Sequence, residues 1–361
     1  MMIVDAHRDI AFDAIDCDRD YRRSVAETRR LEKDVAHPRR KGQTATGLPD
    51  AITAGISIVG ATLFVEPADY KPWGGLTSDF HALHSYHNPQ EAHDLALEQL
   101  HYYEKLAADT ETIRIIRTES DLDSVLATWE EGTDPAKRQQ GFLILMEGAD
   151  PVIEPSQFDE WYERGVRILG TSWSKTRYAG GTSAPGPLTE LGRQLLAEMA
   201  QYHALLDVSH MAEEACLESL YSYQGPIFAS HANPRAFCDT DRHLTDEAIK
   251  LLAGRDGVMG LVLLNLFWKV DWKPGNIVPI SRIVDAVDHI CQLTGSARHV
   301  GIGTDWNAGM GSDEYPHDFD TVADLPKIAA ALTERGYSQP DVEGIMSGNM
   351  LRVIRAGLPA T

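Results

Sequence analysis

Residues 3–9 read Ile-Val-Asp-Ala-His-Arg-Asp, a short apolar, β-branched start that ends in polar side chains. Alternation along a strand places His7 and Asp9 on the same side of the backbone, while Arg8 points away. One strand can therefore present two ligands to one metal ion. Such a strand end is typical of a parallel β/α barrel, because the active site of that fold lies at the carboxyl ends of its strands.

Similar short apolar runs recur along the chain, separated by stretches with helical periodicity, which indicates βαβ units around a parallel sheet. The eight candidate strands are residues 3–9, 56–65, 141–147, 166–172, 205–210, 226–231, 258–264 and 299–305. Eight strands predict the α/β fold class, as a (β/α)8 TIM-type barrel. One more run, residues 112–116, is expected to form a strand outside the barrel.

Helix-start signals lie in the segments between the strands. They are Asn88-Pro89, Thr189-Glu190, Thr245-Asp246 and Ser338-Gln339-Pro340. Residues 17–50, 69–88 and 174–187 are expected to be loops. We find no internal repeat or linker, so residues 1–361 are predicted to form a single domain with elaborated loops.

The charge balance excludes several kinds of partner. The chain has 54 acidic and 33 basic residues, a formal net charge of -21, which repels nucleic acid and anionic lipid surfaces. The N-terminal segment has no basic, apolar leader, and no apolar run approaches the length of a membrane span. We therefore expect a cytoplasmic protein. Its four cysteines form no CxxC pair and are expected to be free thiols.

Several of the other predicted strands also end in a histidine or a carboxylate, and a barrel gathers these ends at one place. The residues are Glu147, His210, His231 and Asp305. A single strand-end histidine more often has a structural role. Many converging polar groups would lack partners, however, whereas metal ions would satisfy all of them. Imidazole and carboxylate ligands together suit zinc, manganese or iron.

Five motifs around these residues occur in a characteristic order. They are Asp5-Ala6-His7-Arg8-Asp9, Glu147-Gly148, Leu206-Asp207-Val208-Ser209-His210, Ser230-His231-Ala232-Asn233 and His299-Val300-Gly301-Ile302-Gly303-Thr304-Asp305. Together they resemble the membrane (renal) dipeptidases of the amidohydrolase superfamily, especially the shorter bacterial members. The resemblance runs nearly end to end, and residues 347–353 are similar to the closing helix of that family.

The resemblance implies a binuclear zinc site. In it, His7 and Asp9 hold one ion, His210 and His231 hold the other, and Glu147 bridges the two. The implied reaction is hydrolysis, by a metal-bridged hydroxide, of the amide bond of a dipeptide, including one with a D-residue at its C-terminal position, or of an N-acyl amino acid. A homodimer is also implied.

The resemblance further implies that Asp305 assists proton transfer from the bridging water to the leaving amine. The structural alternative for Asp305 is a cap on a following helix.

Substrate contacts follow from the same resemblance. Arg242, eleven residues after His231, matches an arginine that pairs with the substrate carboxylate, and a guanidinium can bind both carboxylate oxygens. The alternatives are that Arg242 is an exposed surface arginine, or that Arg235 takes its role. Trp173 is a departure, because it stands where mammalian members have an oxyanion-stabilising histidine; an indole offers only one N–H donor.

Other functions remain open at this point. A related amidohydrolase acting on a lactone, a phosphoester or a cyclic amide would use the same metal chemistry. A non-catalytic metal-binding module is a further alternative. The histidines at positions 81, 84, 87 and 93 are not expected to form a second metal site, because no acidic ligand set lies near them. Their loop, with Tyr70, Trp73 and Tyr86, is expected to be a lid or a subunit contact.

Overall fold

The computed structural model describes residues 1–40, 42–70 and 84–360. Eight parallel strands form a closed barrel, since β13 pairs with β1 as well as with β12. The barrel strands, in spatial order, are β1 (Ile3–Asp9), β2 (Ile56–Phe64), β6 (Gln140–Glu147), β7 (Val166–Gly170), β10 (Leu205–Asp207), β11 (Ile227–Ala232), β12 (Met259–Leu261) and β13 (Val300–Ile302). The predicted α/β barrel and all eight of its strands are confirmed.

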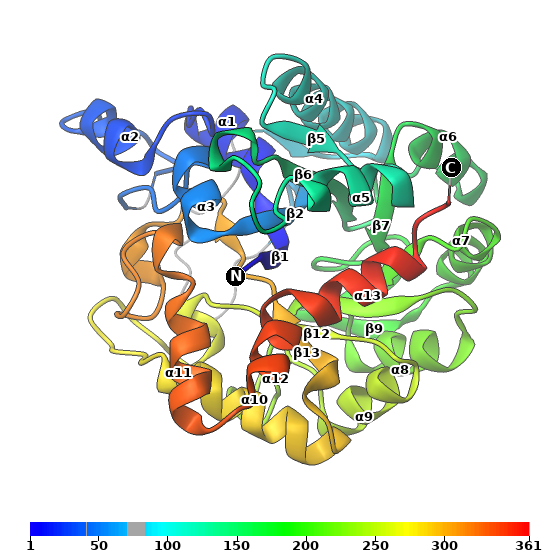
Figure 1. Ribbon diagram of the computed structural model, residues 1–361. Coiled ribbons are helices and arrows are strands. Elements are labelled where there is room, and N and C mark those ends of the chain that lie inside the picture. Colours follow the sequence, from blue (N-terminus) through cyan, green and yellow to red (C-terminus); the bar gives the residue numbers. More distant parts are fainter. Residues whose placement is uncertain (41, 71–83, 361) are drawn as a thin grey trace.

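Helices surround the barrel in the order that the crossovers require (Figure 1). They are α1 (Ile10–Cys17), α2 (Val25–Glu32), α3 (Leu48–Ala54), α4 (Pro89–Ala108), α5 (Glu119–Ala127), α6 (Phe158–Glu163), α7 (Glu190–Gln201), α8 (Glu213–Ser222), α9 (Asp246–Gly254), α10 (Ser281–Thr294), α11 (Lys327–Arg335), α12 (Gln339–Glu343) and α13 (Asn349–Ala356). Each predicted cap is observed: the side chains of Asn88, Thr189, Thr245 and Ser338 accept a backbone N–H in the first turn.

Apolar side chains and the last helix close the amino end of the barrel. Val4, Leu143 and Phe228 belong to one buried cluster with Met350 of α13. The Nδ2 group of Asn349 donates to the carbonyl oxygens of Ala297 and Val300, both at 2.8 Å, which anchors the helix there. Apolar groups therefore fill this end of the barrel, and the polar strand ends lie at the opposite, carboxyl end.

Two of the ligand-bearing strands carry a β-bulge directly at the histidine. In β1 the register against β2 shifts between Asp5 and Arg8, and in β11 the register against β12 shifts between Ala229 and Ala232. A bulge adds one residue to a strand and redirects the side chains that follow it. A glycine of the neighbouring strand faces each bulge: a Cβ at Gly60 would lie 2.1 Å from the oxygen of Ala6, and one at Gly260 would lie 2.0 Å from the oxygen of Ser230.

Gly60→Ala is therefore expected to lower the free energy of unfolding by about 3 kcal/mol, because the added methyl group overlaps a backbone carbonyl that cannot move without closing the bulge. Urea denaturation checks this value. The matched control is Gly254→Ala at the end of α9, where a Cβ meets nothing within 4 Å. Equal effects of the two substitutions would show that the bulge tolerates a side chain.

Some sequence-based boundaries were wrong. The predicted strand 205–210 ends at Asp207, because the Asp207 carboxylate accepts the N–H of Ser209 and His210 adopts a left-handed φ of 65°. The predicted strand 299–305 ends at Ile302 for a similar reason, since the Thr304 N–H donates to Asp5 and Asp305 has a φ of 58°.

Two of the predicted loops contain regular structure. Residues 17–50 include α2, which begins after a Ser24 side chain that accepts the N–H of Glu27. The Ser-x-x-Glu spacing was a signal that the loop assignment overlooked. Residues 174–187 contain most of an antiparallel hairpin, β8 (Ala179–Gly181) and β9 (Ala184–Leu188). Within residues 69–88, the described part includes β4 (Ser85–Tyr86), which pairs with β3 (Glu66–Pro67).

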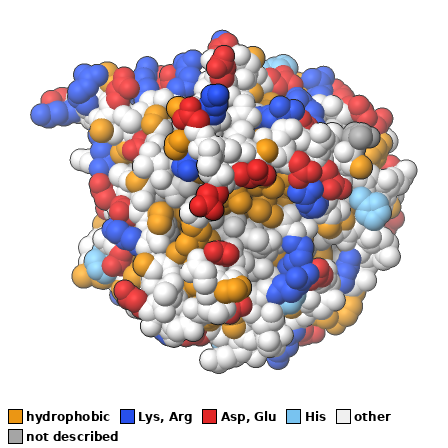
Figure 2. All heavy atoms as spheres, in the orientation of Figure 1, with side chains coloured by type: hydrophobic (Ala, Val, Ile, Leu, Met, Phe, Trp, Pro, Cys, Tyr) orange, Lys and Arg blue, Asp and Glu red, His pale blue; other side chains and the backbone are white. Residues whose placement is uncertain are grey.

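Two further sequence-based expectations about structure are confirmed, the extra strand and the free cysteines. The extra strand is β5 (Ile113–Ile115), which pairs with the start of β6 outside the barrel. The four cysteines are free thiols. Across the helices of the described ranges, none is long and apolar enough to cross a membrane. Acidic and basic side chains are interspersed on the face shown in Figure 2, as expected if much of the acid excess is solvated surface.

Candidate metal centre

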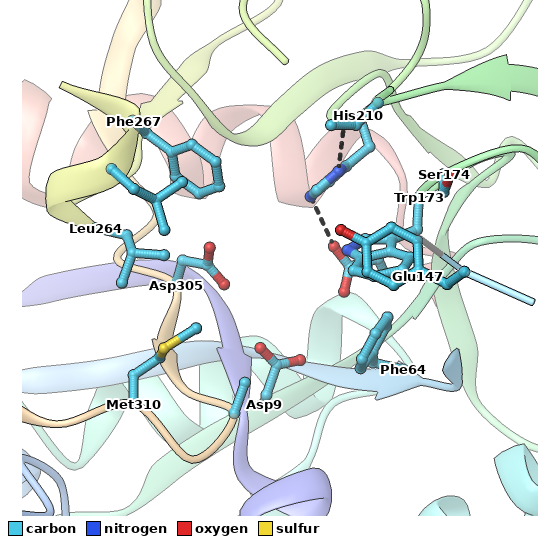
Figure 3. Close-up of a pocket in the computed structure, with 14 residues that line it drawn as sticks. Asp9, Phe64, Glu147, Trp173, Ser174, His210, Leu264, Phe267, Asp305 and Met310 are labelled. Atoms are coloured by element: carbon cyan, nitrogen blue, oxygen red, sulfur yellow. Dashed lines mark hydrogen bonds and ion pairs between the residues drawn. The ribbon is translucent and has the colours of Figure 1, made fainter. Parts of the chain in front are cut away.

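The polar strand ends meet on the floor of a pocket with an empty volume of about 670 Å³ (Figure 3). Asp9, Glu147, His210 and Asp305 all line it. His7 and His231 lie next to them and are fully buried, with their rings stacked at a centroid distance of 3.5 Å. The structure thus brings together all six residues that the sequence proposed for the metal ions and the proton transfer.

Glu147 lies at the middle of the cluster. Its Oε1 atom is 3.2 Å from Nε2 of His210 and 3.3 Å from Nε2 of His231, and its Oε2 atom is 3.5 Å from Nε2 of His7. On the other side, Nε2 of His7 is 3.9 Å from Asp9 and 3.8 Å from Asp305. Potential ligand atoms therefore form two overlapping groups, one around Glu147 and one around Asp9 and Asp305.

A second set of side chains orients the imidazole rings. The Ser230 hydroxyl lies 2.7 Å from Nδ1 of His231 and donates to Oδ2 of Asp207 at 2.5 Å. The Thr182 hydroxyl lies 3.0 Å from Nδ1 of His210. These contacts occupy Nδ1 and leave the Nε2 atoms directed at Glu147. Outer contacts of this type set ring orientation in metal sites.

The Asp305 backbone has an uncommon conformation, and the segment that follows it is held by Arg8 and Asp13 from the start of the chain. Asn307 and Ala308 also have positive φ values, of 119° and 52°. The Asn307 side chain accepts from Nε of Arg8 at 3.1 Å and donates to Asp13 at 2.8 Å. β14 (Trp306–Asn307) follows directly, so the alternative that Asp305 caps a helix is wrong. Backbone strain of this kind is characteristic of functional sites.

The electrostatics of the cluster favour a cation. Burial raises the pKa of Glu147 to about 8, although Arg242 lowers it. Burial also raises the pKa values of Asp9 and Asp305, and the nearby charge of Glu147 raises both further. Burial lowers the pKa values of His210 and His231 well below the usual range. In the absence of a cation, the three carboxylates therefore tend to keep their protons. A cation that replaces these protons stabilises the ionised carboxylates as ligands, beside neutral imidazoles.

The donor set fits a divalent metal ion. Nε2 of His7 is buried and has no hydrogen-bond partner among the described residues, although three carboxylates lie within 4 Å of it. A buried imidazole nitrogen without a partner costs free energy, and a metal ion would remove that cost. Mixed nitrogen and carboxylate oxygen ligands are those of zinc sites.

These shifts predict how the metal-free protein responds to pH. Between about pH 6.5 and 8 the folded state keeps protons on its carboxylates that the unfolded chain releases, so stability should fall by on the order of 2 kcal/mol as the pH rises. Below pH 6.5 the buried histidines oppose this trend, because the unfolded chain then takes up protons on them. Chemical denaturation of chelator-treated protein at several pH values tests this. Saturation with metal should abolish the decline, and an unchanged decline would contradict the proposed ligands.

Arg242 is buried beside the cluster. It is 2% exposed, so the alternative of a surface arginine is wrong. Its Nη2 donates to the carbonyl of His231 at 2.8 Å, and its guanidinium lies 4.8 Å from the ring centre of Phe267 in the pocket wall. Within the described part of the chain, its Nε and Nη1 groups have no hydrogen-bond partner. Arg235 instead pairs with Glu213 at 2.9 Å. Of the two arginines considered for the substrate carboxylate, Arg242 is thus the one that lies beside the cluster.

Trp173 lines the pocket beside Glu147. Its ring centroid lies 4.8 Å from that of Phe64, 4.5 Å from that of Tyr70 and 6.1 Å from that of His210. The side chain therefore forms part of the aromatic side of the pocket.

The described histidines of the other candidate cluster have ordinary partners. His84 lies 2.6 Å from Asp16, His87 pairs with Glu91, and Nδ1 of His93 lies 3.1 Å from the carbonyl of Pro151. His81 and Trp73 lie outside the described residues. Both groups of three or more potential ligands found in the described ranges are at the barrel cluster.

Sequence reasoning missed the residues that orient the ligands. Asp207 and Ser230 lie within the family motifs, where no role was predicted for them, and Thr182 lies in a segment predicted to be a loop. Asp207 had a usable signal, since a carboxylate at the end of an apolar strand is costly unless it is hydrogen-bonded. It accepts three such bonds, from the backbones of Ser209 and Ser230 and from the Ser230 hydroxyl. No local pattern marked Thr182 or Asn307.

Comparison with known proteins identifies the family. The family model described as membrane dipeptidase, peptidase family M19, matches residues 1–358. The chain belongs to this family. The resemblance found in the motifs is thereby confirmed, together with the enzyme class of a membrane-dipeptidase-like metallohydrolase.

Sequence relatives of this M19 chain include dipeptidases of animals. Dipeptidase 3 of Homo sapiens is 26% identical over 283 residues, which cover 74% of this chain and 52% of that protein. An uncharacterized protein of Klebsiella pneumoniae, from the pqqA 5' region, is 28% identical over 211 residues, 56% of this chain and 76% of that protein. The chain thus spans about half the length of the animal dipeptidases that it matches.

Solved structures share the fold of this family member. A metallo peptidase from Rhodobacter sphaeroides, liganded with a phosphinate mimic of the dipeptide L-Ala-D-Ala, superimposes with a TM-score of 0.77 at 20% identity and 99% coverage of both chains. The probable dipeptidase PvdM of Pseudomonas aeruginosa has a TM-score of 0.74 at 20% identity, covering 99% of this chain and 96% of its own.

Proposed function

We propose that this protein is a binuclear metal-dependent dipeptidase that hydrolyses the amide bond of a dipeptide or an N-acyl amino acid. The observation that carries the proposal is the cluster of three imidazoles and three carboxylates on the pocket floor, with the Glu147 carboxylate at its centre. His7 and Asp9 would hold one ion, His210 and His231 the other, and Glu147 would contact both. Zinc is the metal that we favour.

Divalent cations at these ligands would acidify a water molecule and polarise the scissile carbonyl. The protein's own side chains would transfer the proton and bind the substrate. Asp305 faces the pocket from the side opposite Glu147, and 16% of its side chain is exposed (Figure 3). It can accept a proton from the attacking water and pass it to the leaving amine, because its carboxylate faces the pocket next to the ligand cluster.

Arg242 would bind the free carboxylate of the substrate through its Nε and Nη1 groups, which have no hydrogen-bond partner in the described ranges. The R. sphaeroides neighbour supports a dipeptide with a D-residue at its C-terminal position, since a mimic of L-Ala-D-Ala is bound in that structure. We propose the same substrate class here.

The direct test is an assay of the zinc-loaded protein against dipeptides with L- or D-residues at the C-terminal position, in parallel with N-acyl amino acids. Hydrolysis of these amides supports the proposal. No amide hydrolysis by protein with two bound ions per chain would overturn it, and fewer than one ion per chain after careful purification would favour a non-catalytic role.

Arg242→Lys is expected to raise KM for a dipeptide by about 100-fold, because a point charge replaces two directed donors. With the corresponding dipeptide amide, which lacks the carboxylate, wild type and variant should differ by less than about threefold. Steady-state kinetics on both substrates checks this. Equal losses on both would mean that Arg242 acts on the cluster rather than on the substrate.

Two further expectations stay predictions. The resemblance to the family predicts a homodimer, which light scattering after gel filtration would test. A cytoplasmic location is expected from the sequence, and fractionation of the source cells would test it.

A further inference from the structure

The pocket has two different walls, on opposite sides of the carboxylate cluster. One consists of the rings of Phe64, Tyr70 and Trp173, which we call the aromatic wall. Figure 3 shows Trp173 and Phe64 on the side of Glu147, and Leu264, Phe267 and Met310 on the side of Asp305.

The position of Arg242 orients a substrate between these walls. Its guanidinium lies against Phe267, so a substrate carboxylate held by Arg242 is on the Phe267 side of the pocket. The scissile carbonyl has to lie at the cluster, between the walls. The part of the substrate on the amino side of that carbonyl then faces the aromatic wall.

The aromatic wall is held firmly from behind. Phe64 packs on Phe12 at a ring distance of 5.6 Å, and both belong to a small buried cluster against which Trp173 packs. The Trp173 carbonyl accepts the N–H of Thr182 at 3.0 Å, in the segment whose hydroxyl contacts His210. A preformed apolar surface of this kind gains affinity from an apolar group that displaces water from it.

We propose that the aromatic wall is a specificity site for an apolar side chain, or an apolar acyl group, on the amino side of the scissile bond. This inference rests on the proposed dipeptidase function and narrows its substrate class. Aromatic rings also attract cations, so a substrate with a basic side chain is the competing occupant that the experiment has to separate.

The experiment measures kcat/KM for dipeptides that share one C-terminal residue and carry glycine, alanine, norleucine or lysine at the amino position. Each buried methylene contributes about fourfold, and norleucine has three more methylenes than alanine, so norleucine should exceed alanine by about 60-fold. Norleucine is the uncharged aliphatic counterpart of lysine, and it should exceed lysine by at least about tenfold. A flat series, or a preference for lysine, would overturn the inference.

Two variants locate the effect. Trp173→Ala should reduce the norleucine-to-alanine ratio to below about fivefold, while Trp173→Phe should keep most of it. This ratio is independent of any general loss of rate. The matched control is Met310→Ala on the opposite wall, which should alter preference for the C-terminal residue and leave the norleucine-to-alanine ratio unchanged.

The outcomes separate the two proposals. If no dipeptide is cleaved, the proposed function fails. If dipeptides are cleaved without regard to the amino-side residue, or if Met310→Ala rather than Trp173→Ala changes the ratio, the function stands and the aromatic-wall inference alone is overturned. The substrate series on the unchanged protein decides the matter even if Trp173→Ala fails to fold.

Discussion

Asp305→Asn is expected to lower kcat on a dipeptide by about 10³-fold while the protein keeps its metal ions. The substitution preserves shape and removes the ability to take up and release a proton, a function that typically contributes 10²- to 10⁴-fold. The Asp305 side chain lies 3.8 Å from His7 and faces the pocket, where the proposed proton transfer would take place.

Kinetics and metal analysis of the same preparation check this prediction. The pH–rate profile of the variant should also lose the limb that Asp305 contributes. Asp94→Asn, at an exposed position on α4, is the control and should leave kcat unchanged. If Asp305→Asn loses metal in proportion to activity, Asp305 is a ligand instead, an arrangement that its grouping with His7 and Asp9 would allow.

Glu147→Gln is expected to remove most of the bound metal and to lower activity by more than about 10³-fold. Its carboxylate lies within 3.5 Å of the Nε2 atoms of His7, His210 and His231, so it reaches ligands proposed for both ions. A neutral amide would not supply the negative charge that the two proposed cations would share.

The same variant should behave differently in its metal-free form. Burial makes ionised Glu147 costly there, as its raised pKa shows, so Glu147→Gln should keep or increase the melting temperature of chelator-treated protein. Mass spectrometry of the metals and thermal melts with and without zinc test both parts. Glu163→Gln, on an exposed position of α6, is the control. Retention of two ions per chain by Glu147→Gln would refute the central role of Glu147.

The sequence by itself determined the barrel and the chemical nature of its site. Eight apolar runs were visible because a parallel strand buried on both faces needs a nearly continuous apolar sequence. His7, Glu147, His210, His231 and Asp305 were visible because a polar residue directly after such a run stands out, and because the barrel fold gathers strand ends. Convergence followed from topology without any knowledge of distances.

Only the tertiary structure decided how these groups are aimed. The bulges at His7 and His231 depend on Gly60 and Gly260 in neighbouring strands, and the Asp305 backbone depends on Arg8 and Asp13. The orientation of His210 depends on Thr182, and the burial of Arg242 depends on Phe267. Each pair is distant in sequence, and its contact arises from side-chain packing and hydrogen bonds that no local pattern encodes. The sequence therefore determined which groups meet, whereas packing between distant segments decided which atoms face one another.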